Sequence, residues 1–184
     1  VDIGLRVLLG QRQACVSTSD SRPAAIAAMA DRAVAMAKEA PEDPTVGLAD
    51  PSQLTAQTDS GYLELCDESP EPDPQTLQDY ALRAEAAAQE NAGISQVSET
   101  SAGYSRRQIH AAATNGFSGG YARSDIGLSC VAISGTGTGM ERDYDYDTRI
   151  FQSDMREPED IGRTAAARAV DRAGSRRPKT GAYP

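Results

Sequence analysis

Six prolines between positions 41 and 74 constrain the fold more than any other feature of this sequence. Proline has no backbone N–H, so it cannot continue a helix or occupy a central strand. We therefore predict a loop over residues 41–75, in which only YLELCD, residues 62–67, resembles a strand. The loop separates two segments of regular structure.

The segment before the loop predicts a hairpin and a helix. Residues 3–18 alternate apolar and polar side chains around a turn at Gly10, which is the pattern of two paired strands. Over residues 22–39 apolar side chains recur every three or four positions. This spacing predicts an amphipathic helix with Pro23 in its first turn.

The segment after the loop predicts two helices with a sheet between them. Asp73 and Pro74 suit the N-cap and first position of a helix over residues 75–91. Pro158 stands among acidic residues at the start of another helix, over residues 158–173. Between the helices, β-type patterns predict strands over residues 94–104, 107–114, 117–124, 126–134 and 139–148.

Turns are predicted where these strands meet polar sequences. Residues 105–107 and 124–127 indicate two turns, and Asn115-Gly116 the clearest one, because a type I′ turn needs positive φ at both central residues. The expected class is α+β: a largely antiparallel sheet with two to three helices packed on one face. Alanine inflates the apolar share of 39%, so we expect helices of small residues.

The composition restricts the partners of the chain. A net charge of -9 argues against nucleic acid, which needs clustered Lys and Arg, and favours basic or extended peptides. No segment approaches the roughly 20 apolar residues of a membrane helix, so no membrane contact is expected. Three widely spaced cysteines without a CxxC pair suggest reduced thiols and a cytoplasmic protein.

The acid-rich motif MERDYDYD, residues 140–147, has two interpretations. As a calcium loop it fails twice, because Thr148 stands where glycine is needed and Asp154 replaces the bidentate glutamate. As a strand it places its acids on one face, with same-face neighbours about 6.5–7 Å apart. We then expect the acid face towards solvent or a partner and the aromatic face in packing. The candidate partner or peptide contacts are Asp143, Asp145, Asp147, Arg142, Tyr144 and Tyr146.

Other motifs predict no chemistry. GTGTG, residues 135–139, matches neither GxGxxG nor a Walker loop, so a flexible hairpin loop is expected. His110 is the only histidine, which excludes a His-Glu-x-x-His zinc site and favours a surface or packed histidine. Cys15 and Cys130 lie in strand patterns and are expected to be small buried residues. The sequence assigns no catalytic residue and no metal ligand.

Several phrases along nearly the whole chain resemble the TldD/PmbA family. They are GLRVLLGQRQACVSTSD (4–20), APEDPTVGLAD (40–50), TNGFSGGYARS (114–124), GMERDYDYD (139–147) and KTGAYP (179–184). STSD, NGFSGGY and ERDYDY are similar to the PmbA, or TldE, branch. The resemblance implies an N-terminal domain over residues 1–178 with a truncated start, and residues 179–184 as the beginning of a missing C-terminal domain.

The family resemblance also implies a function. TldD and TldE resemble paired subunits of a cytoplasmic zinc peptidase that degrades or trims unfolded peptides, and the family is also named as a modulator of DNA gyrase. A His-Glu-x-x-x-His helix of the TldD-type partner carries the zinc, and PmbA-type chains lack it. This chain would be a non-catalytic subunit without a cofactor, bound to a TldD-like subunit or to itself, and to unfolded or extended peptides. The alternatives are a homomeric protein with its own activity, and a stand-alone acidic binding or adaptor domain with calcium as candidate ligand.

Overall fold

The structure, a computed structural model, describes residues 1–183 and confirms the α+β class. Contacts divide the chain into two compact units, one of Val1–Ala56 with Ala113–Phe117 and one of Gln57–Ala112 with the chain from Ser118 onward. The sequence patterns did not predict this division. The last residue of the predicted segment 179–184 lies outside the described residues.

The first unit is a hairpin covered by a helix. β1 (Ile3–Leu9) and β2 (Arg12–Thr18) pair antiparallel, with Gly10 at positive φ in the turn between them. α1 (Pro23–Glu39) packs on the hairpin and buries Met29, Ala33 and Ala37. The predicted hairpin and first helix are confirmed.

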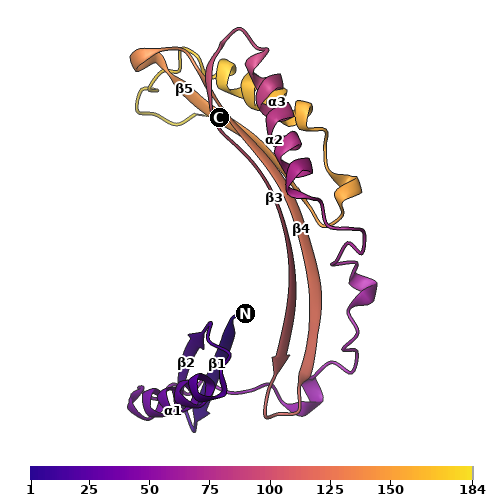
Figure 1. The fold of residues 1–184 in the computed structure, drawn as a ribbon. Coiled ribbons are helices and arrows are strands. Elements are labelled where there is room, and N and C mark those ends of the chain that lie inside the picture. The colour runs from indigo at the N-terminus through magenta and orange to yellow at the C-terminus, as the bar shows by residue number, and fades with distance from the viewer. Residues whose placement is uncertain (184) are drawn as a thin grey trace. The chain divides into compact units, whose positions relative to one another are not determined.

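The second unit is a sheet with two helices on one face. β3 (Ile94–Ala112), β4 (Ser118–Ser134) and β5 (Glu141–Arg149) form an antiparallel sheet in that order. α2 (Pro74–Gln89) and α3 (Pro158–Asp171) pack on the sheet (Figure 1). Both helices lie within two residues of their predicted bounds.

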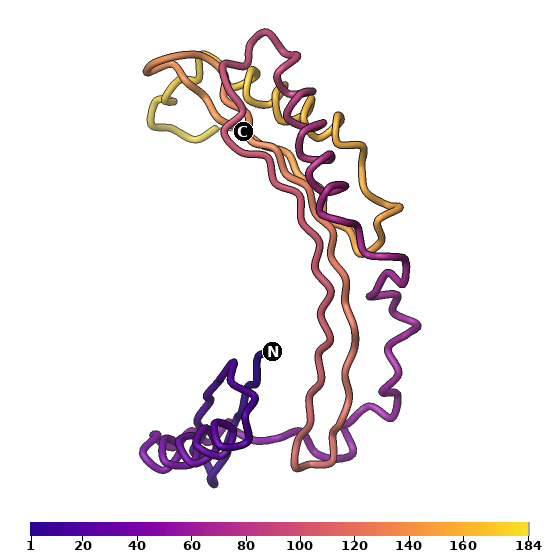
Figure 2. Tube along the Cα trace, viewed as in Figure 1, coloured from indigo at the N-terminus to yellow at the C-terminus, as the bar shows by residue number. Residues whose placement is uncertain are grey.

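β3 and β4 are each one long strand, so the turns predicted at 105–107 and 124–127 are wrong. The two strands pair along their whole length and run side by side in the Cα trace (Figure 2). β5 and the helices cover only part of them, and residues 105–112 are exposed on both faces. Residues 105–108 are polar on both faces of this exposed stretch, and such a run of polar residues resembles the composition of a turn. We call residues 105–112 and 118–123 the ribbon.

The predicted turn at Asn115-Gly116 exists, but its type is different. The carbonyl of Ala113 accepts a hydrogen bond from the backbone N–H of Gly116, and the N–H of Ala113 donates to the carbonyl of Phe117. Only Gly116 has positive φ, at 96°. The connection is therefore a three-residue hairpin loop, which needs one left-handed residue where a type I′ turn needs two.

The core of the second unit lies between its sheet and its helices and consists mostly of small residues. Gly162 of α3 lies so close to α2 that a Cβ atom there would come within 2.0 Å of the carbonyl oxygen of Ala84. This close approach permits alanine to fill the space between the helices. The core residues are Ala84, Ala88, Leu128, Cys130, Ala132, Ile161, Ala165, Ala166 and Ala169.

The loop that the prolines predict is present, but YLELCD is not a strand. Gly61–Leu63 form a short 3-10 helix, and Glu64 has a positive φ of 49°, which ends any extended conformation. Further along, the carbonyl of Leu65 accepts a hydrogen bond of 3.1 Å from the N–H of Ser124. The Ser124 hydroxyl then accepts one of 2.7 Å from the N–H of Asp67. The loop is thus tied to β4 near the place where β5 ends.

Candidate functional site

The alternating faces of β5 are oriented by its pairing with β4. Asp147 lies opposite Leu128 and Asp145 opposite Cys130, both of which are core residues under the helices. Side chains of directly paired residues share a face of the sheet. The acids of β5 therefore face α3, and its tyrosines face the other side, which we call the open face.

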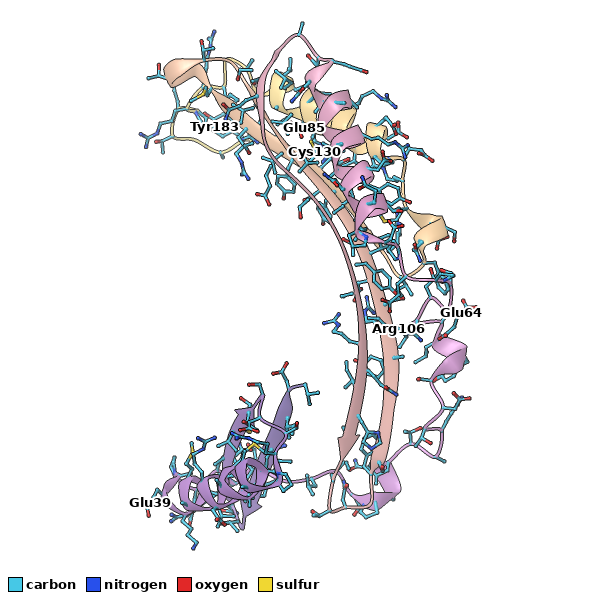
Figure 3. The ribbon with its side chains drawn as sticks, in the orientation of Figure 1. Glu39, Glu64, Glu85, Arg106, Cys130 and Tyr183 are labelled. Carbon is cyan, nitrogen blue, oxygen red and sulfur yellow. The ribbon has the colours of Figure 1, made fainter. Side chains whose placement is uncertain are left out.

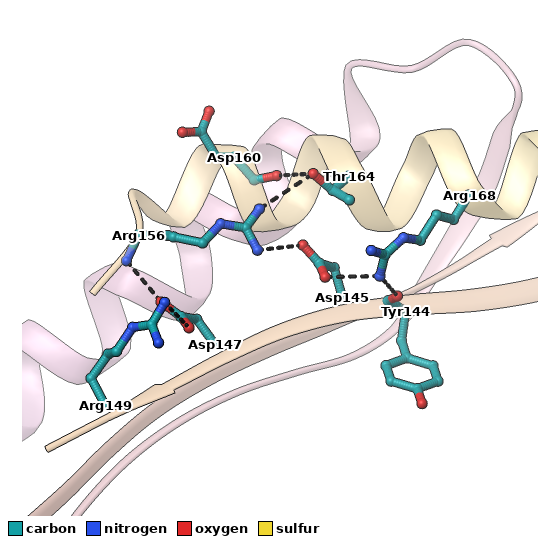
Figure 4. A network of polar contacts seen from close by, with 8 residues as sticks. All are labelled: Tyr144, Asp145, Asp147, Arg149, Arg156, Asp160, Thr164 and Arg168. Carbon is teal, nitrogen blue, oxygen red and sulfur yellow. Dashed lines mark hydrogen bonds and ion pairs between the residues drawn. The ribbon is translucent and has the colours of Figure 1, made fainter. Parts of the chain in front are cut away.

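Asp145 is buried between α3 and the sheet and binds two arginines. Only 4% of the residue is exposed. Its Oδ2 lies 2.8 Å from Nη1 of Arg156, and its Oδ1 lies 2.8 Å from Nη1 of Arg168 (Figure 4). Arg168 also donates a hydrogen bond of 3.0 Å to the carbonyl of Tyr144. A carboxylate bound on both oxygens by guanidinium groups is a strong, charge-assisted arrangement.

The neighbouring acids are paired in the same way. Asp147, 7% exposed, accepts a hydrogen bond of 3.0 Å from the N–H of Arg156, and its Oδ1 lies 3.1 Å from Nη2 of Arg149. Asp143 lies 3.2 Å from Arg172. A hydrogen bond from the N–H of Tyr144 and, after it, the contact with Arg172 hold the pKa of Asp143 below its ordinary value.

The predicted orientation of the acid motif was therefore wrong. Its carboxylates do not face solvent, because Arg168 of α3 and Arg172 at the C-cap of this helix, four positions apart, pair with them. The preceding Arg156 adds a third cation. This spacing of arginines was visible in the sequence and is the signal that would have indicated an internal partner for the acids.

The described residues do not fit a metal ion. Within residues 1–183 no group of three or more His, Cys, Asp or Glu side chains is arranged to hold one. A calcium site would need Asp145 and Asp147, but their carboxylate oxygens accept hydrogen bonds from arginine side chains and from a backbone N–H. A zinc site would need several converging ligands, and His110 is exposed, with the Ser118 hydroxyl 3.2 Å from its Nε2.

The open face carries exposed aromatic side chains instead. Tyr144 is 49% exposed and Tyr146 is 59% exposed, and their rings stack with centroids 6.1 Å apart. The Tyr144 ring points away from α3 (Figure 4). Arg142 lies exposed on the same face. The expectation that these tyrosines pack inside was thus also wrong.

A hollow of about 320 Å³ lies beside Tyr146 on the open face. Gly103 and Gly127 are paired across β3 and β4 and form its floor, and a Cβ on Gly103 would meet no atom within 4 Å. The absence of side chains at this pair therefore creates the space. The residues around it are Ser101, Gly103, Gly127, Leu128, Ser129, Tyr146 and Thr148.

The three cysteines are free, and they differ in burial. Cys130, labelled in Figure 3, is buried in the core between the sheet and its two helices, as predicted, and burial raises the pKa of its thiol to about 11. Cys15 is exposed, so its predicted burial was wrong, because α1 covers only the other face of the hairpin. The GTGTG sequence forms the connection between β4 and β5, as expected.

None of the helices within residues 1–183 has the length and apolar character needed to cross a bilayer.

Sequence models of two protein domains match this chain. The model of the PmbA/TldA metallopeptidase domain 1 matches residues 1–37. The model of the PmbA/TldA metallopeptidase central domain matches residues 67–173, which is more than half of the chain.

Two curated relatives are similar over most of the chain. Metalloprotease PmbA of Escherichia coli O157:H7 is 29% identical over 181 residues, which cover 97% of this chain and 39% of that protein. The Metalloprotease PmbA homolog of Haemophilus influenzae is 28% identical over 173 residues, 92% of this chain and 37% of its own length. The chain thus spans less than half the length of these relatives.

Three crystal structures share the fold. A proposed modulator of DNA gyrase from Bacteroides thetaiotaomicron matches 96% of this chain and 40% of its own, with 20% identity and a TM-score of 0.77. A similar protein of Thermotoga maritima matches 98% and 39%, with 17% identity and a TM-score of 0.67. TldE from Thermococcus kodakarensis matches 91% and 36%, with 18% identity and a TM-score of 0.64. Because the central-domain model covers most of the second unit, the chain belongs to the PmbA/TldD family of metallopeptidases.

Proposed function

We propose that this chain is part of a non-catalytic subunit of a TldD/TldE-type zinc metallopeptidase complex, and that its open sheet face holds the unfolded peptide. The observation that carries the proposal is the pair of exposed, stacked tyrosines beside the hollow at Gly103 and Gly127. Tyrosine supplies a large amphipathic contact area and loses little conformational freedom on binding. The hollow offers space for a side chain of the bound peptide.

The subunit role in this proposal is supported by family membership and by the likeness to TldE of Thermococcus kodakarensis. The zinc is assigned to a TldD-like partner, because the buried carboxylate of β5 already forms ion pairs with arginines. Trimming or degradation of the peptide would then take place in that partner. A cytoplasmic location is part of the same proposal and agrees with three free thiols.

The test uses the whole protein that contains this chain, together with a TldD-type partner. Tyr144→Ser combined with Tyr146→Ser should weaken binding of an unfolded peptide about tenfold, because both aromatic contacts are lost. Fluorescence anisotropy of a labelled peptide measures the affinity. Tyr62→Ser combined with Tyr183→Ser is the matched control, because both tyrosines are exposed elsewhere in the chain.

Two results would contradict the proposal. Unchanged peptide affinity in the Tyr144 and Tyr146 variant would remove the open face from peptide binding. Cleavage of the peptide by the purified protein without its partner would contradict the non-catalytic role. A cleavage assay with and without added zinc, and with and without the partner, measures this second point.

A further inference from the structure

Two arginines face each other on the open face of the ribbon. Arg107 of β3 is the direct pairing partner of Arg123 of β4, so their side chains lie side by side. Like charges directly opposite each other destabilise a sheet. The odd-numbered neighbours along β4, including Asp125 and Gly127, lie on the same face. The arginine pair therefore belongs to the same surface as the hollow.

Asp125 holds the two arginines together. Arg107 Nη2 lies 2.7 Å from Asp125 Oδ2, and Arg123 reaches Oδ1 with Nη2 at 2.9 Å and with Nε at 3.1 Å. These bonds hold the pKa of Asp125 below its ordinary value, first through Arg123 and then, against the effect of burial, through Arg107. One carboxylate thus fixes the position of two guanidinium groups.

Most of the hydrogen-bonding capacity of the pair is unused. A guanidinium group has five N–H donors. Among the described residues, the guanidinium group of Arg107 makes one hydrogen bond, to Asp125. Its side chain is exposed, so the remaining donors are accessible. Two arginines against one aspartate leave a net positive charge at this point of a chain whose net charge is -9. A carboxylate would therefore be attracted to this site and repelled by the chain as a whole.

The row beside the arginines is apolar. Ile109 and Tyr121 are paired across the ribbon, and both are partly exposed. Same-face rows on a strand are about 6.6 Å apart, which is also the distance between alternate side chains of an extended peptide. An extended segment lying along the ribbon would place an acidic side chain on the arginines and an apolar side chain, two positions away, on Ile109 and Tyr121. The face continues on both sides of the arginines, so an internal side chain fits better than a chain end.

We propose that Arg107 and Arg123, held by Asp125, bind the carboxylate of an Asp or Glu side chain in an extended peptide that has an apolar residue two positions away. This site rests on the proposed function, because it selects among the peptides that the open face would hold.

The test compares three short peptides that contain Leu-Ser-Glu or Leu-Ser-Gln, each N-acetylated, by anisotropy with the whole protein. Two are C-terminally amidated and differ only in Glu or Gln, and the third has Gln and a free terminal carboxylate. The amidated Glu peptide should bind about tenfold more tightly than both others, as expected for charge-assisted hydrogen bonds to a carboxylate. Arg107→Gln with Arg123→Gln should abolish this preference.

Two further variants distinguish a built site from general attraction. Arg176→Gln with Arg177→Gln makes the same change in net charge at exposed positions and should keep the preference. Arg107→Lys with Arg123→Lys keeps the charge and loses the planar fork, so the preference should fall several-fold. Full preference in the lysine variant would overturn the site, as would a preference for the free terminal carboxylate.

The failure of this site and the failure of the proposed function give different results. Equal binding of the Glu and Gln peptides would overturn the carboxylate site and leave the peptide-binding face intact. Binding of none of the three peptides would overturn both.

Discussion

The two faces of the β3–β4–β5 sheet are built from the same strands and have opposite chemistry. The face under α2 and α3 buries alanines together with Asp145 and Asp147. The open face exposes Tyr144 and Tyr146. In β5 the aspartates are therefore inside and the tyrosines outside, which reverses the usual distribution.

The difference shows that the covering element decides which face of an alternating strand is buried. α3 brings arginines to β5, and a buried carboxylate is tolerated when it is paired and hydrogen-bonded. The open face has no such cover, and its glycines and tyrosines form a surface instead of a core. Three substitutions test this contrast, in order of decreasing expected effect on stability.

The largest effect is expected on the covered face, from Gly162→Ala. The added Cβ would lie 2.0 Å from the carbonyl oxygen of Ala84 and 3.1 Å from the N of Ala88, so α2 and α3 must move apart. Overpacking of this kind costs about 3 kcal/mol, more than the roughly 1 kcal/mol that alanine gains over glycine in a helix. Urea denaturation followed by circular dichroism should show the loss in free energy of unfolding.

The matched control is Gly103→Ala on the open face. A Cβ there meets no atom within 4 Å, so the free energy of unfolding should stay the same or rise slightly. An equal loss in both variants would contradict the contrast between the faces. The control variant also fills part of the hollow, so its peptide affinity tests whether the hollow holds a side chain of the peptide.

Asp145→Asn should have the second largest effect. The change keeps the shape of the side chain and leaves Arg156 and Arg168 without their shared anion. Both arginines are partly exposed and are able to turn to water, so we expect a loss of about 2 kcal/mol, below the 3–5 kcal/mol of a fully buried pair. Tyr146→Ser, the next residue on the open face, should cost clearly less in the same urea titration. Similar losses would show that Asp145 is not a structural anchor.

Local patterns predicted the helices of this fold but not the arrangement of its sheet. The capping of α2 by Asp73, whose carboxylate accepts a hydrogen bond of 2.7 Å from the N–H of Thr76, depends on neighbours in sequence and was predicted correctly. The orientation of β5 depends on α3, which follows it by a loop, and alternation alone does not say which face is covered. The continuity of β3 was missed because residues 105–108 are polar on both faces of the strand.

The candidate site shows the same limit. The sequence singled out Tyr144 and Tyr146 from a motif, but it expected them inside. Arg107, Arg123 and Asp125 were not singled out at all, because residues 105–107 and 124–127 were assigned to turns. Their shared face depends on the pairing register of two uninterrupted strands. A prediction of one long hairpin around Asn115-Gly116 would have brought them together.

The smallest effect on stability concerns the loop that meets the sheet where β5 ends. Hydrogen bonds from the N–H groups of Gln152 and Ser69, at 2.9 and 2.8 Å, lower the pKa of Asp67 from its ordinary 3.8. A lowered pKa in the folded chain means that this contribution is complete above the unfolded value and is lost as pH falls through the folded value. The free energy of unfolding should therefore drop less between pH 5 and pH 2 in Asp67→Asn than in the parent chain. Glu71→Gln changes an exposed carboxylate of the same loop, and its free energy of unfolding should fall with pH as in the parent chain. Urea titrations at each pH measure both variants. An unchanged pH dependence in Asp67→Asn would show that this carboxylate does not anchor the loop.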